Sequence, residues 1–498
     1  MRLSEFIGGR KTLMIAPAGH GKTHAIAECV KICPEGSRQL VLTHTHAGIA
    51  SIKAKLKKLN VDESKFDVVT ISGFAQRIVA SYVGLNALDQ KQEEKGYFDC
   101  VLFKCICLLA KESVASVIQI SYDGIFVDEY QDCNSQQHKL IMKLSDMMPT
   151  HLLGDPLQGI YDFAGSCIDF DNDLKDFERF DLLTTPWRWK ADGNCRKLGD
   201  QILKIRNLLL SGVTELKLKN DAKSHYRVTL IDSKEKNPAN YFRNVGNFLR
   251  NLTDNSVLVI IPTYTDPKTG AIKGNVDERA MLCRQLAIDH SYSLLEAIDD
   301  KSFYMVAKCA DELVSKLRKH RENTNYIKLV YDILAKLKFN KTDLNKWISD
   351  SGNRLIERRN PYKEDSAKLS TLVKAFMDDA CFDILYALID FFERDIKLRS
   401  KRPSLLHAVK KCIRDSQEND LSVYENMCRY KNLLRLKGRK VDGRYVGTTL
   451  LTKGLEFSTV VILDAHRIED RKNFYVAISR ASKELHIFTS DRCLSFKK

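Results

Sequence analysis

The stretch that most constrains the fold of this chain is residues 16–23 (APAGHGKT), a glycine-rich turn. An apolar run at residues 12–15 precedes it, and a helical pattern at residues 25–30 follows it. A strand, a glycine-rich turn and a helix, in this order, form the context in which such a turn binds phosphate. Gly19 and Gly21 allow the backbone to curl so that N–H groups face phosphate oxygens, and the helix dipole favours negative charge there. The alternative is a glycine-rich turn with a chance lysine, since Ala16 stands where the strict pattern has glycine.

This turn also supplies side chains that suit a nucleotide. Lys22 is expected to reach the β- and γ-phosphates, and Thr23 is expected to ligate Mg²⁺. The residues expected around the phosphates are Ala18, Gly19, His20, Gly21, Lys22 and Thr23.

Two carboxylates, Asp128 and Glu129, follow a short apolar run at residues 124–127. Two acids at the end of a buried strand are unfavourable unless they serve a cation or a water molecule. In a P-loop protein the first would hold Mg²⁺ and the second would deprotonate the attacking water. Two acids in a solvated loop are the alternative.

Apolar runs that alternate with helical patterns predict a parallel α/β sheet. The predicted strands are residues 39–43, 68–71, 124–127 and 151–153, and helices are predicted at 47–56 and from about Phe74. Gln158 lies in a loop after the last of these strands, where it could sense a γ-phosphate. Tyr161 and Phe163 in the same loop could stack on bases, with core packing as the alternative.

Bulk properties limit the partners of the chain. A net charge of +15 favours a polyanion, most often nucleic acid, although a merely basic protein is the alternative. No run of eighteen apolar residues is present, so we expect no membrane partner. The fourteen cysteines lack Cys-x-x-Cys spacing, which favours reduced thiols in a cytoplasmic protein over a metal cluster.

Taken together, the motifs resemble the UvrD/Rep/PcrA family of superfamily 1 DNA helicases in order and rough spacing. The stretches that carry the resemblance are residues 16–23, 128–132 (DEYQD), 154–161 (GDPLQGIY), 187–188 (WR), 453–457 (KGLEF) and 475–481 (YVAISRA). They cover about residues 10–190 and 440–490. The resemblance implies an ATP hydrolase of class α/β, with two RecA-like P-loop NTPase domains, helical insertions, and ATP with Mg²⁺ between the domains.

The resemblance also implies domain boundaries. The first RecA-like domain is expected at residues 1–82 and 119–190, with a small helical insertion at 83–118. The second is expected at 191–299 and 439–498, with a helical insertion at 300–438. Apolar residues at helical spacing, between positions 326 and 337 and between 369 and 388, support the second insertion.

By the same resemblance each motif residue has a role. Asp128 and Thr23 would hold Mg²⁺, Trp187 would stack on adenine and Glu456 would meet the ribose. The residues expected to carry the hydrolysis are Lys22, Glu129 as base, Gln158 and Arg188 at the γ-phosphate, and Arg480 as arginine finger.

Several positions depart from the family pattern, and most of them would face DNA. The DNA-binding residues expected from the resemblance are Thr43, His44, Thr70, Tyr161 and Phe163. The departures are Thr43-His44-Thr45-His46, Ser72-Gly73, Ala164 and Leu450-Leu451-Thr452, and no Gln precedes Gln39 to read adenine. ATP hydrolysis is therefore better supported than strand separation.

Two functions follow. The first is an ATP-dependent translocase or helicase, moving 3′ to 5′ on single-stranded or tailed DNA. The alternative is an ATP-binding regulatory subunit that senses DNA and controls a partner nuclease without robust unwinding. Short UvrD-like chains of this layout resemble the helicase subunit of Gabija antiphage systems, which would place the chain in antiviral defence.

Overall fold

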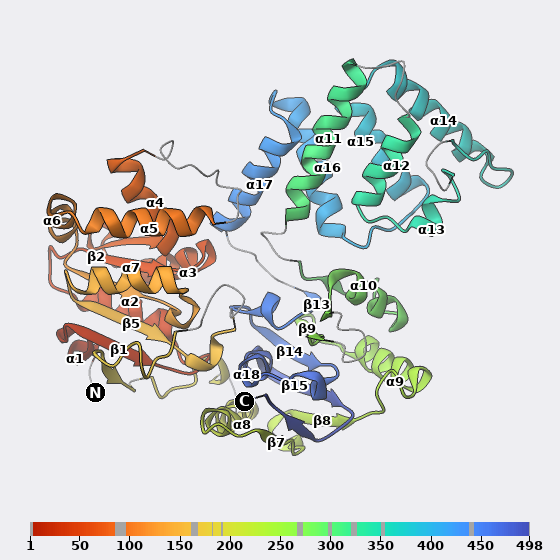
Figure 1. Ribbon diagram of the computed structural model, residues 1–498. Coiled ribbons are helices and arrows are strands. Elements are labelled where there is room, and N and C mark those ends of the chain that lie inside the picture. Colours follow the sequence, from red (N-terminus) through yellow and green to blue (C-terminus); the bar gives the residue numbers. More distant parts are fainter. Residues whose placement is uncertain are drawn as a thin grey trace. The chain divides into compact units, whose positions relative to one another are not determined.

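The chain forms two compact units (Figure 1). The first unit comprises Met1–Gly274 and Leu436–Lys498, and the second comprises Asn275–Arg435. The computed structural model describes residues 3–84, 96–160, 168–181, 183–190, 193–265, 272–296, 301–319, 326–349, 354–437 and 443–497.

A six-stranded parallel sheet forms the N-terminal half of the first unit. Its strands are β1 (Lys11–Ile15), β2 (Gln39–Thr43), β3 (Phe66–Thr70), β4 (Gly124–Val127), β5 (Thr150–Gly154) and β6 (Glu178–Phe180). They lie in the order β3-β2-β4-β5-β1-β6. Because the strands are parallel, the loops after β1, β4 and β5 leave the sheet at one edge, where α/β proteins bind ligands.

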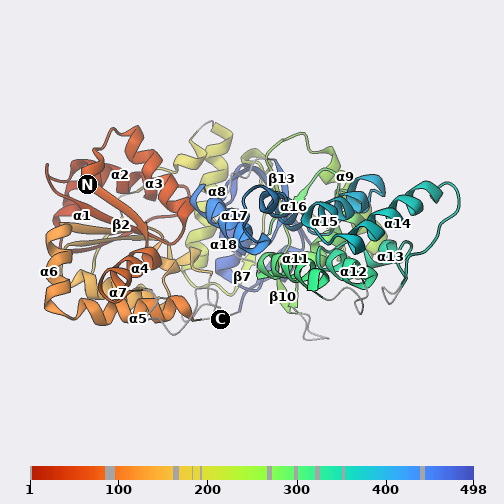
Figure 2. The ribbon, with the colours of Figure 1, turned by 90° about the horizontal axis from the view of Figure 1, so that it is seen from above.

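Helices cover both faces of this sheet, as Figure 2 shows. One face packs against α1 (Leu3–Gly8), α2 (Lys22–Ile32) and α3 (His46–Lys58). The other packs against α4 (Ile71–Tyr82), α5 (Tyr97–Leu109), α6 (Glu112–Ser121) and α7 (Ser135–Ser145). Leu40 and Leu42 belong to the second core while Val41 belongs to the first. Both faces are therefore buried, which explains why the strands read as continuous apolar runs.

Two details differ from the expectation or refine it. Helix α4 begins at Ile71 and not near Phe74, because the Thr70 hydroxyl accepts a hydrogen bond from the Gly73 N–H at 3.0 Å and caps the helix. The expected helical segment at 83–118 contains α5 and the first seven residues of α6, which ends at Ser121, and Val101 and Val114 from these helices lie in the same core as the sheet.

A second parallel sheet forms the C-terminal half of the first unit. Its strands in this unit are β8 (Tyr226–Leu230), β9 (Val257–Ile260), β13 (Arg444–Gly447), β14 (Phe457–Ile462) and β15 (Ala481–Thr489), in the order β13-β9-β14-β15-β8. The helices α8 (Gly193–Leu210), α9 (Pro238–Asn251) and α18 (Arg471–Ile478) accompany it. Short strands are β7 (Glu215–Lys217) with β16 (Cys493–Ser495), and β10 (Tyr264–Thr265) with β11 (Ile272–Lys273). The predicted α/β class with two RecA-like domains is confirmed.

The second unit is mainly helical and has its own core. Its elements are α10 (Val276–Gln285), β12 (Ser293–Leu294), α11 (Lys301–Lys319), α12 (Tyr326–Lys336), α13 (Lys341–Leu344), α14 (Lys363–Asp378), α15 (Phe382–Asp390), a π-helical turn (Phe391–Asp395), α16 (Pro403–Glu418) and α17 (Val423–Lys437). The apolar pattern from Leu369 to Leu388 is divided between α14 and α15, because the backbone is extended at Asp379 (φ −140°, ψ 95°).

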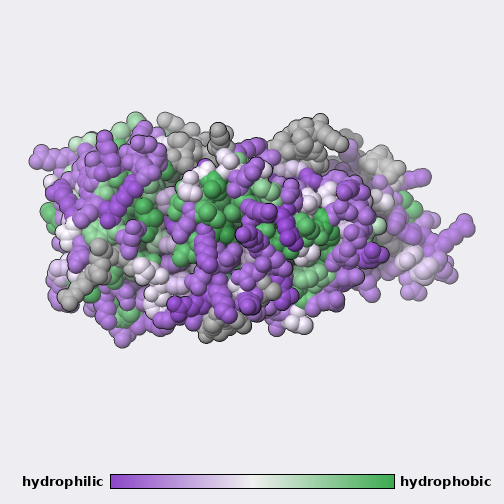
Figure 3. All heavy atoms as spheres, turned by 90° about the horizontal axis from the view of Figure 1, so that it is seen from below, coloured by the Kyte–Doolittle hydropathy of each residue, from purple (hydrophilic) through white to green (hydrophobic). Residues whose placement is uncertain are grey.

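Polar side chains cover most of the face of the molecule drawn in Figure 3, and hydrophobic side chains gather in smaller areas. Within the described part of the chain, no helix has both the length and the apolar character needed to cross a membrane. The cysteines that the structure describes are free thiols.

Candidate active site

The glycine-rich turn after β1 adopts the curled backbone that its sequence predicts. Gly19 (φ 74°) and Gly21 (φ 86°) lie in the left-handed region, and α2 begins directly after them. A Cβ atom on Gly19 would lie 2.7 Å from the Cβ atom of Arg188, so the backbone angle and the close approach both require glycine. Ala16 does not adopt a positive φ, which explains why alanine is tolerated there.

Lys22 points back over this turn. Its Nζ atom donates hydrogen bonds to the backbone oxygens of Ala16 at 3.1 Å and Pro17 at 3.5 Å. His20 is buried beside it, and its Nδ1 atom lies 2.9 Å from the backbone oxygen of Ala18. Burial lowers the pKa of His20, so the imidazole is neutral near pH 7. Lys22 therefore supplies the positive charge of the turn.

Thr23 and Asp128 come from α2 and the end of β4, and they meet. The Thr23 hydroxyl donates a hydrogen bond to Oδ2 of Asp128 at 3.1 Å. Burial raises the pKa of Asp128 to about 7, and the neighbouring Glu129 charge acts in the same direction. A buried carboxylate with an unfavourable charge is the kind of group that a cation stabilises.

Glu129 occupies a strained backbone position directly after Asp128, with φ 53° and ψ 45°. Its Oε2 atom accepts a hydrogen bond from Nε2 of Gln131 at 2.6 Å. Burial alone would raise the pKa of Glu129, but the Lys22 charge and the Gln131 hydrogen bond outweigh it, so the pKa is lowered. Glu129 is therefore ionised and able to accept a proton.

Gln158 is held by a buried ion pair in the loop after β5. Its Nε2 atom donates to Oδ2 of Asp155 at 3.0 Å, and Arg206 of α8 donates from Nη2 to Oδ1 of Asp155 at 3.0 Å. Asp155 is fully buried, and its backbone N–H donates to Oε1 of Gln131 at 2.9 Å. Gln158 and Glu129 are thus connected through Asp155 and Gln131.

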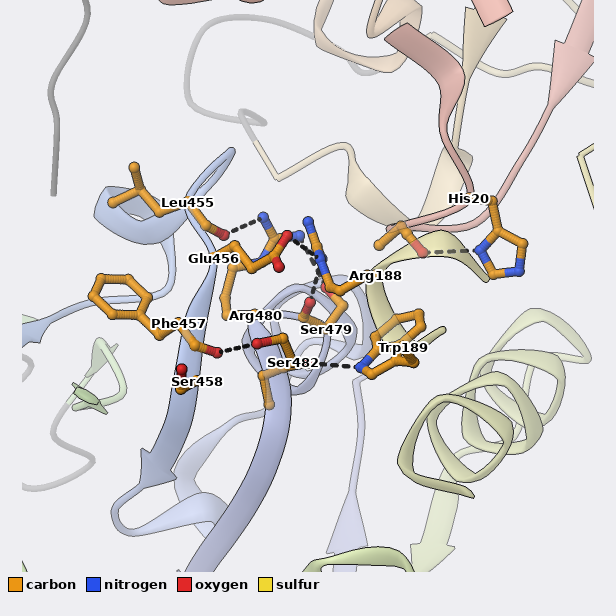
Figure 4. Close-up of polar contacts among 12 residues, drawn as sticks. His20, Arg188, Trp189, Leu455, Glu456, Phe457, Ser458, Ser479, Arg480 and Ser482 are labelled. Carbon is orange, nitrogen blue, oxygen red and sulfur yellow. Dashed lines mark hydrogen bonds and ion pairs between the residues drawn. The ribbon is translucent and has the colours of Figure 1, made fainter. Parts of the chain in front are cut away.

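Arg188 lies in the connection between the two sheets and reaches the second one (Figure 4). Its Nε atom donates to Oε2 of Glu456 at 2.7 Å, and its Nη1 atom donates to the backbone oxygen of Ser479. Trp187, one residue earlier, is 53% exposed, and Nζ of Lys190 lies 4.2 Å from the centroid of its ring. Its Cδ1 atom lies 3.0 Å from the position that a Cβ atom on Gly21 would take.

Arg480 follows α18 and lies fully inside the site. Its Nη2 atom donates to Oε1 of Gln158 at 3.3 Å, and its Nε and Nη1 atoms donate to the backbone oxygens of Val476 at 2.9 Å and Leu455 at 3.2 Å. Burial, together with the Arg188 charge, lowers the pKa of Arg480 to about 10, so the guanidinium stays charged at pH 7. The site therefore gathers charged side chains from both sheets.

The structure does not bring the five residues expected to bind DNA together at the site described above. Thr43 is buried, and Thr70 is buried with its hydroxyl capping α4. His44 is half-buried with its Nε2 atom 3.6 Å from Sγ of Cys133, and burial lowers its pKa to about 4. Tyr161 and Phe163 lie outside the described residues. DNA binding by these five residues stays a prediction.

Lys453 connects the second sheet to the loop after Glu129. Its Nζ atom forms an ion pair with Asp132 and donates to the backbone oxygen of Gln158. Burial raises the pKa of Asp132 to about 7, although the Lys453 charge opposes this effect. The sequence assigned no role to either side chain.

Sequence reasoning missed four other residues at this site: Asp155, Trp189, Arg206 and Tyr475. Asp155 carries the signal used for Asp128, a carboxylate directly after a buried strand. Trp189 is buried and donates from Nε1 to the backbone oxygen of Ala481 at 2.8 Å. No local pattern indicates Arg206, because it lies within a long, largely polar helix.

Two family models match the chain. The UvrD/REP helicase N-terminal domain matches residues 85–178, and the viral superfamily 1 RNA helicase core domain matches residues 384–489. The first range contains Glu129 and Gln158, and the second contains Glu456 and Arg480, so each match includes part of the site. The chain is superfamily 1 helicase-like. Both models describe helicases, so each matched segment is similar to a helicase domain.

The comparisons with curated proteins and with solved structures add little about the chain. No curated protein matches its sequence. A solved structure of arterivirus nonstructural protein 10 (helicase) with DNA matches at 10% identity and a TM-score of 0.33, covering 98% of this chain and 62% of that chain. The helicase-like chain therefore spans less than two thirds of the arterivirus chain, and a match this weak says nothing about activity.

Proposed function

We propose that this chain is an ATP-driven translocase that moves 3′ to 5′ along single-stranded DNA. The observation that carries the proposal is the hydrogen bond from Arg480 to Gln158 at 3.3 Å, which brings the second sheet to the hydrolytic residues of the first. Charged side chains from the two sheets can stabilise the same transferring phosphoryl group only when the sheets are close together. Hydrolysis is therefore coupled to closure of the two RecA-like domains.

The side chains fit a nucleotide with Mg²⁺. The Thr23 hydroxyl and the Asp128 carboxylate, 3.1 Å apart, are oxygen ligands of the kind that Mg²⁺ prefers. Gly19 and Gly21 give the turn its positive φ angles, and Lys22 lies over the same turn. Trp187 offers an exposed indole to a base. Mg²⁺ held by Thr23 and Asp128 would neutralise negative charge on phosphate oxygens.

Glu129 suits the role of general base. It is ionised, and the Gln131 amide fixes its Oε2 atom at 2.6 Å. Gln158 would orient the attacking water, while Arg188 and Arg480 would face the γ-phosphate. A fixed carboxylate that accepts a proton from water typically contributes about 10²- to 10⁴-fold to a rate.

The test is the steady-state rate of ATP hydrolysis with and without single-stranded DNA. We expect stimulation by DNA, and we expect Glu129→Gln and Lys22→Ala to abolish it. Glu112→Gln, at the first residue of α6, is the control and should hydrolyse ATP normally. Full turnover in both site variants would contradict the mechanism.

The same assay separates the finer parts of the proposal. Single-stranded RNA in place of DNA tests the choice of nucleic acid, and GTP in place of ATP tests the choice of base. Duplexes with a 3′ or a 5′ tail test direction, since a 3′ to 5′ motor separates only the first kind. Equal activity on both tails would contradict the proposed polarity.

The burial of Thr43 and Thr70 favours a second candidate, the regulatory subunit of a partner nuclease. Two side chains that would otherwise contact nucleic acid face the protein interior. ATP hydrolysis that is indifferent to DNA and RNA, together with co-purification of a nuclease, would support this candidate. Unwinding of a tailed duplex by the chain alone would exclude it.

A further inference from the structure

A buried hydrogen bond joins the phosphate-binding turn to the helix that leads to Arg480. The hydroxyl of Tyr475, on α18, accepts a hydrogen bond from the backbone N–H of Ala18 at 2.9 Å. Tyr475 is 1% exposed, so water does not replace this contact. The Tyr475 side chain thus fixes the backbone of Ala18, although the two residues are 457 positions apart in the sequence.

The same hydroxyl also belongs to a wider polar network. The ion pair of Asp155 and Arg206 is its charged neighbour, and Cζ of Arg206 lies 5.9 Å from the centroid of the Tyr475 ring. Burial raises the pKa of Tyr475, and the Asp155 charge acts in the same direction, so the hydroxyl keeps its proton at neutral pH.

Asp155 connects this network to the hydrolytic side chains. It accepts a hydrogen bond from Gln158, whose Oε1 atom accepts one from Arg480. Its own backbone N–H donates to Gln131, which donates in turn to Glu129. Every link is buried or partly buried, and such networks rigidify the groups that they connect.

We propose that Tyr475 is a positioning residue that fixes Arg480 relative to the phosphate-binding turn. This inference rests on the proposed function and deepens it. Tyr475 touches no reacting atom; it holds α18 against the turn through its hydrogen bond with Ala18. Arg480 lies five residues further along the chain and depends on the placement of this helix. Because small misplacement of a catalytic group lowers rates steeply, loss of the hydroxyl should act on turnover.

The test is Tyr475→Phe, which removes the hydroxyl and keeps the ring. We expect kcat for nucleic-acid-stimulated ATP hydrolysis to fall by about tenfold or more, while KM for ATP changes by less than about threefold. The rate is expressed per molecule that binds a non-hydrolysable ATP analogue, so partial unfolding does not imitate the effect. An unchanged kcat, or a raised KM with an unchanged kcat, would overturn the inference.

Tyr226→Phe is the matched control. Tyr226 lies on β8 of the same unit, it is fully buried, and its hydroxyl has no hydrogen-bond partner among the residues that the structure describes. Its removal tests the general effect of deleting a buried phenol hydroxyl from this unit. We expect kcat and KM to stay unchanged.

A double substitution tests whether Tyr475 acts through Arg480. Arg480→Lys keeps a charge and loses the planar guanidinium that reaches Gln158. If positioning is the role, Tyr475→Phe should lower kcat by less than about twofold in the Arg480→Lys protein, because coupled residues are not additive. A full tenfold loss there would overturn the inference and leave the proposed function intact. Absence of hydrolysis in the unaltered protein would overturn both.

Discussion

Arg188 donates a hydrogen bond from Nε to Oε2 of Glu456 at 2.7 Å, although 268 residues separate the two in the sequence. The Glu456 side chain is 49% exposed, so solvent screens the pair and its contribution to stability is at most about 1 kcal/mol. Arg188 is proposed at the γ-phosphate and Glu456 at the ribose. If these two roles hold, nucleotide binding competes with this ion pair.

Glu456→Gln should consequently change nucleotide binding far more than stability. We expect the free energy of unfolding in urea to fall by less than about 1 kcal/mol. We expect KM for ATP to rise about tenfold, because a ribose hydroxyl loses a charged acceptor. Glu469→Gln breaks an ion pair with Lys497 in the same unit and should leave KM unchanged. A KM equal to that of the unaltered protein would contradict the role of Glu456.

Alanine substitutions at Gly19 and Gly36 separate the effect of backbone strain from the effect of a steric clash. Both have positive φ, 74° and 77°, but a Cβ atom would meet Arg188 at Gly19 and open space at Gly36. Gly36→Ala should lower the free energy of unfolding by about 1–2 kcal/mol, and Gly19→Ala should lower it by more, because its Cβ atom would also lie 2.7 Å from Cβ of Arg188. Only Gly19→Ala should also weaken ATP binding, which titration with a fluorescent ATP analogue measures. Equal affinities in the two variants would show that this contact does not matter.

Substitution of Trp189 should lower stability, whereas substitution of Trp187 should affect nucleotide binding. Trp189 is 2% exposed and fills the space beside Gly19 and Gly199, so Trp189→Ala should lower the free energy of unfolding by about 3–5 kcal/mol. Trp187 is 53% exposed, and Trp187→Ala should lower it by less than about 1 kcal/mol while raising KM for ATP. Urea unfolding and steady-state kinetics separate the two. A Trp187→Ala protein with normal KM would contradict base stacking.

His151 should make stability depend on pH. It packs between Phe6 and Phe126, its Nδ1 atom lies 2.7 Å from the Thr12 hydroxyl, and burial lowers its pKa to about 4. Between pH 6.5 and 4 the unfolded chain binds a proton that the folded chain does not bind. The free energy of unfolding should therefore be highest above pH 6.5 and fall by up to about 3 kcal/mol as the pH is lowered to 4.

His151→Asn removes this titration and should make the fall shallower by up to about 3 kcal/mol, leaving the share of His44, whose pKa burial also lowers to about 4. His24→Asn, on a half-exposed position of α2, is the control and should keep the full fall. The measurement is urea unfolding of the full chain at pH 7, 6, 5 and 4. An equally steep fall in the His151→Asn protein would assign the pH dependence to other groups.

Much of the fold follows from local sequence pattern. The strand at residues 39–43 was predicted at its observed bounds, and the strand at 124–127 likewise, because long buried runs of β-branched and aliphatic residues have few other structures open to them. Element ends were less predictable. Helix α4 starts three residues earlier than expected because one hydroxyl, that of Thr70, caps it.

The candidate site was predicted only in part. Strong local signals are carried by the turn at residues 16–23 and by Asp128 and Glu129. The resemblance to superfamily 1 helicases, which the family models confirm, added Gln158, Arg188 and Arg480. The roles of these residues, and the resemblance to Gabija systems, stay predictions. Trp189, Arg206 and Tyr475 were missed because their importance depends on contacts and not on residue type. Asp155 was missed although it carries the same local signal as Asp128, a carboxylate directly after a buried strand.

The sequence by itself determined the first α/β sheet and the phosphate-binding turn, because periodicity, glycine backbone freedom and strand–turn–helix order are properties of neighbouring residues. The second sheet was expected from the resemblance to superfamily 1 helicases. Only the tertiary structure decided which distant groups meet. Ala18 with Tyr475, and Asp155 with Arg206, are paired because burial removes water and leaves each polar group to find its partner inside the protein. Such pairing depends on how two sheets pack, and no local pattern in the chain encodes it.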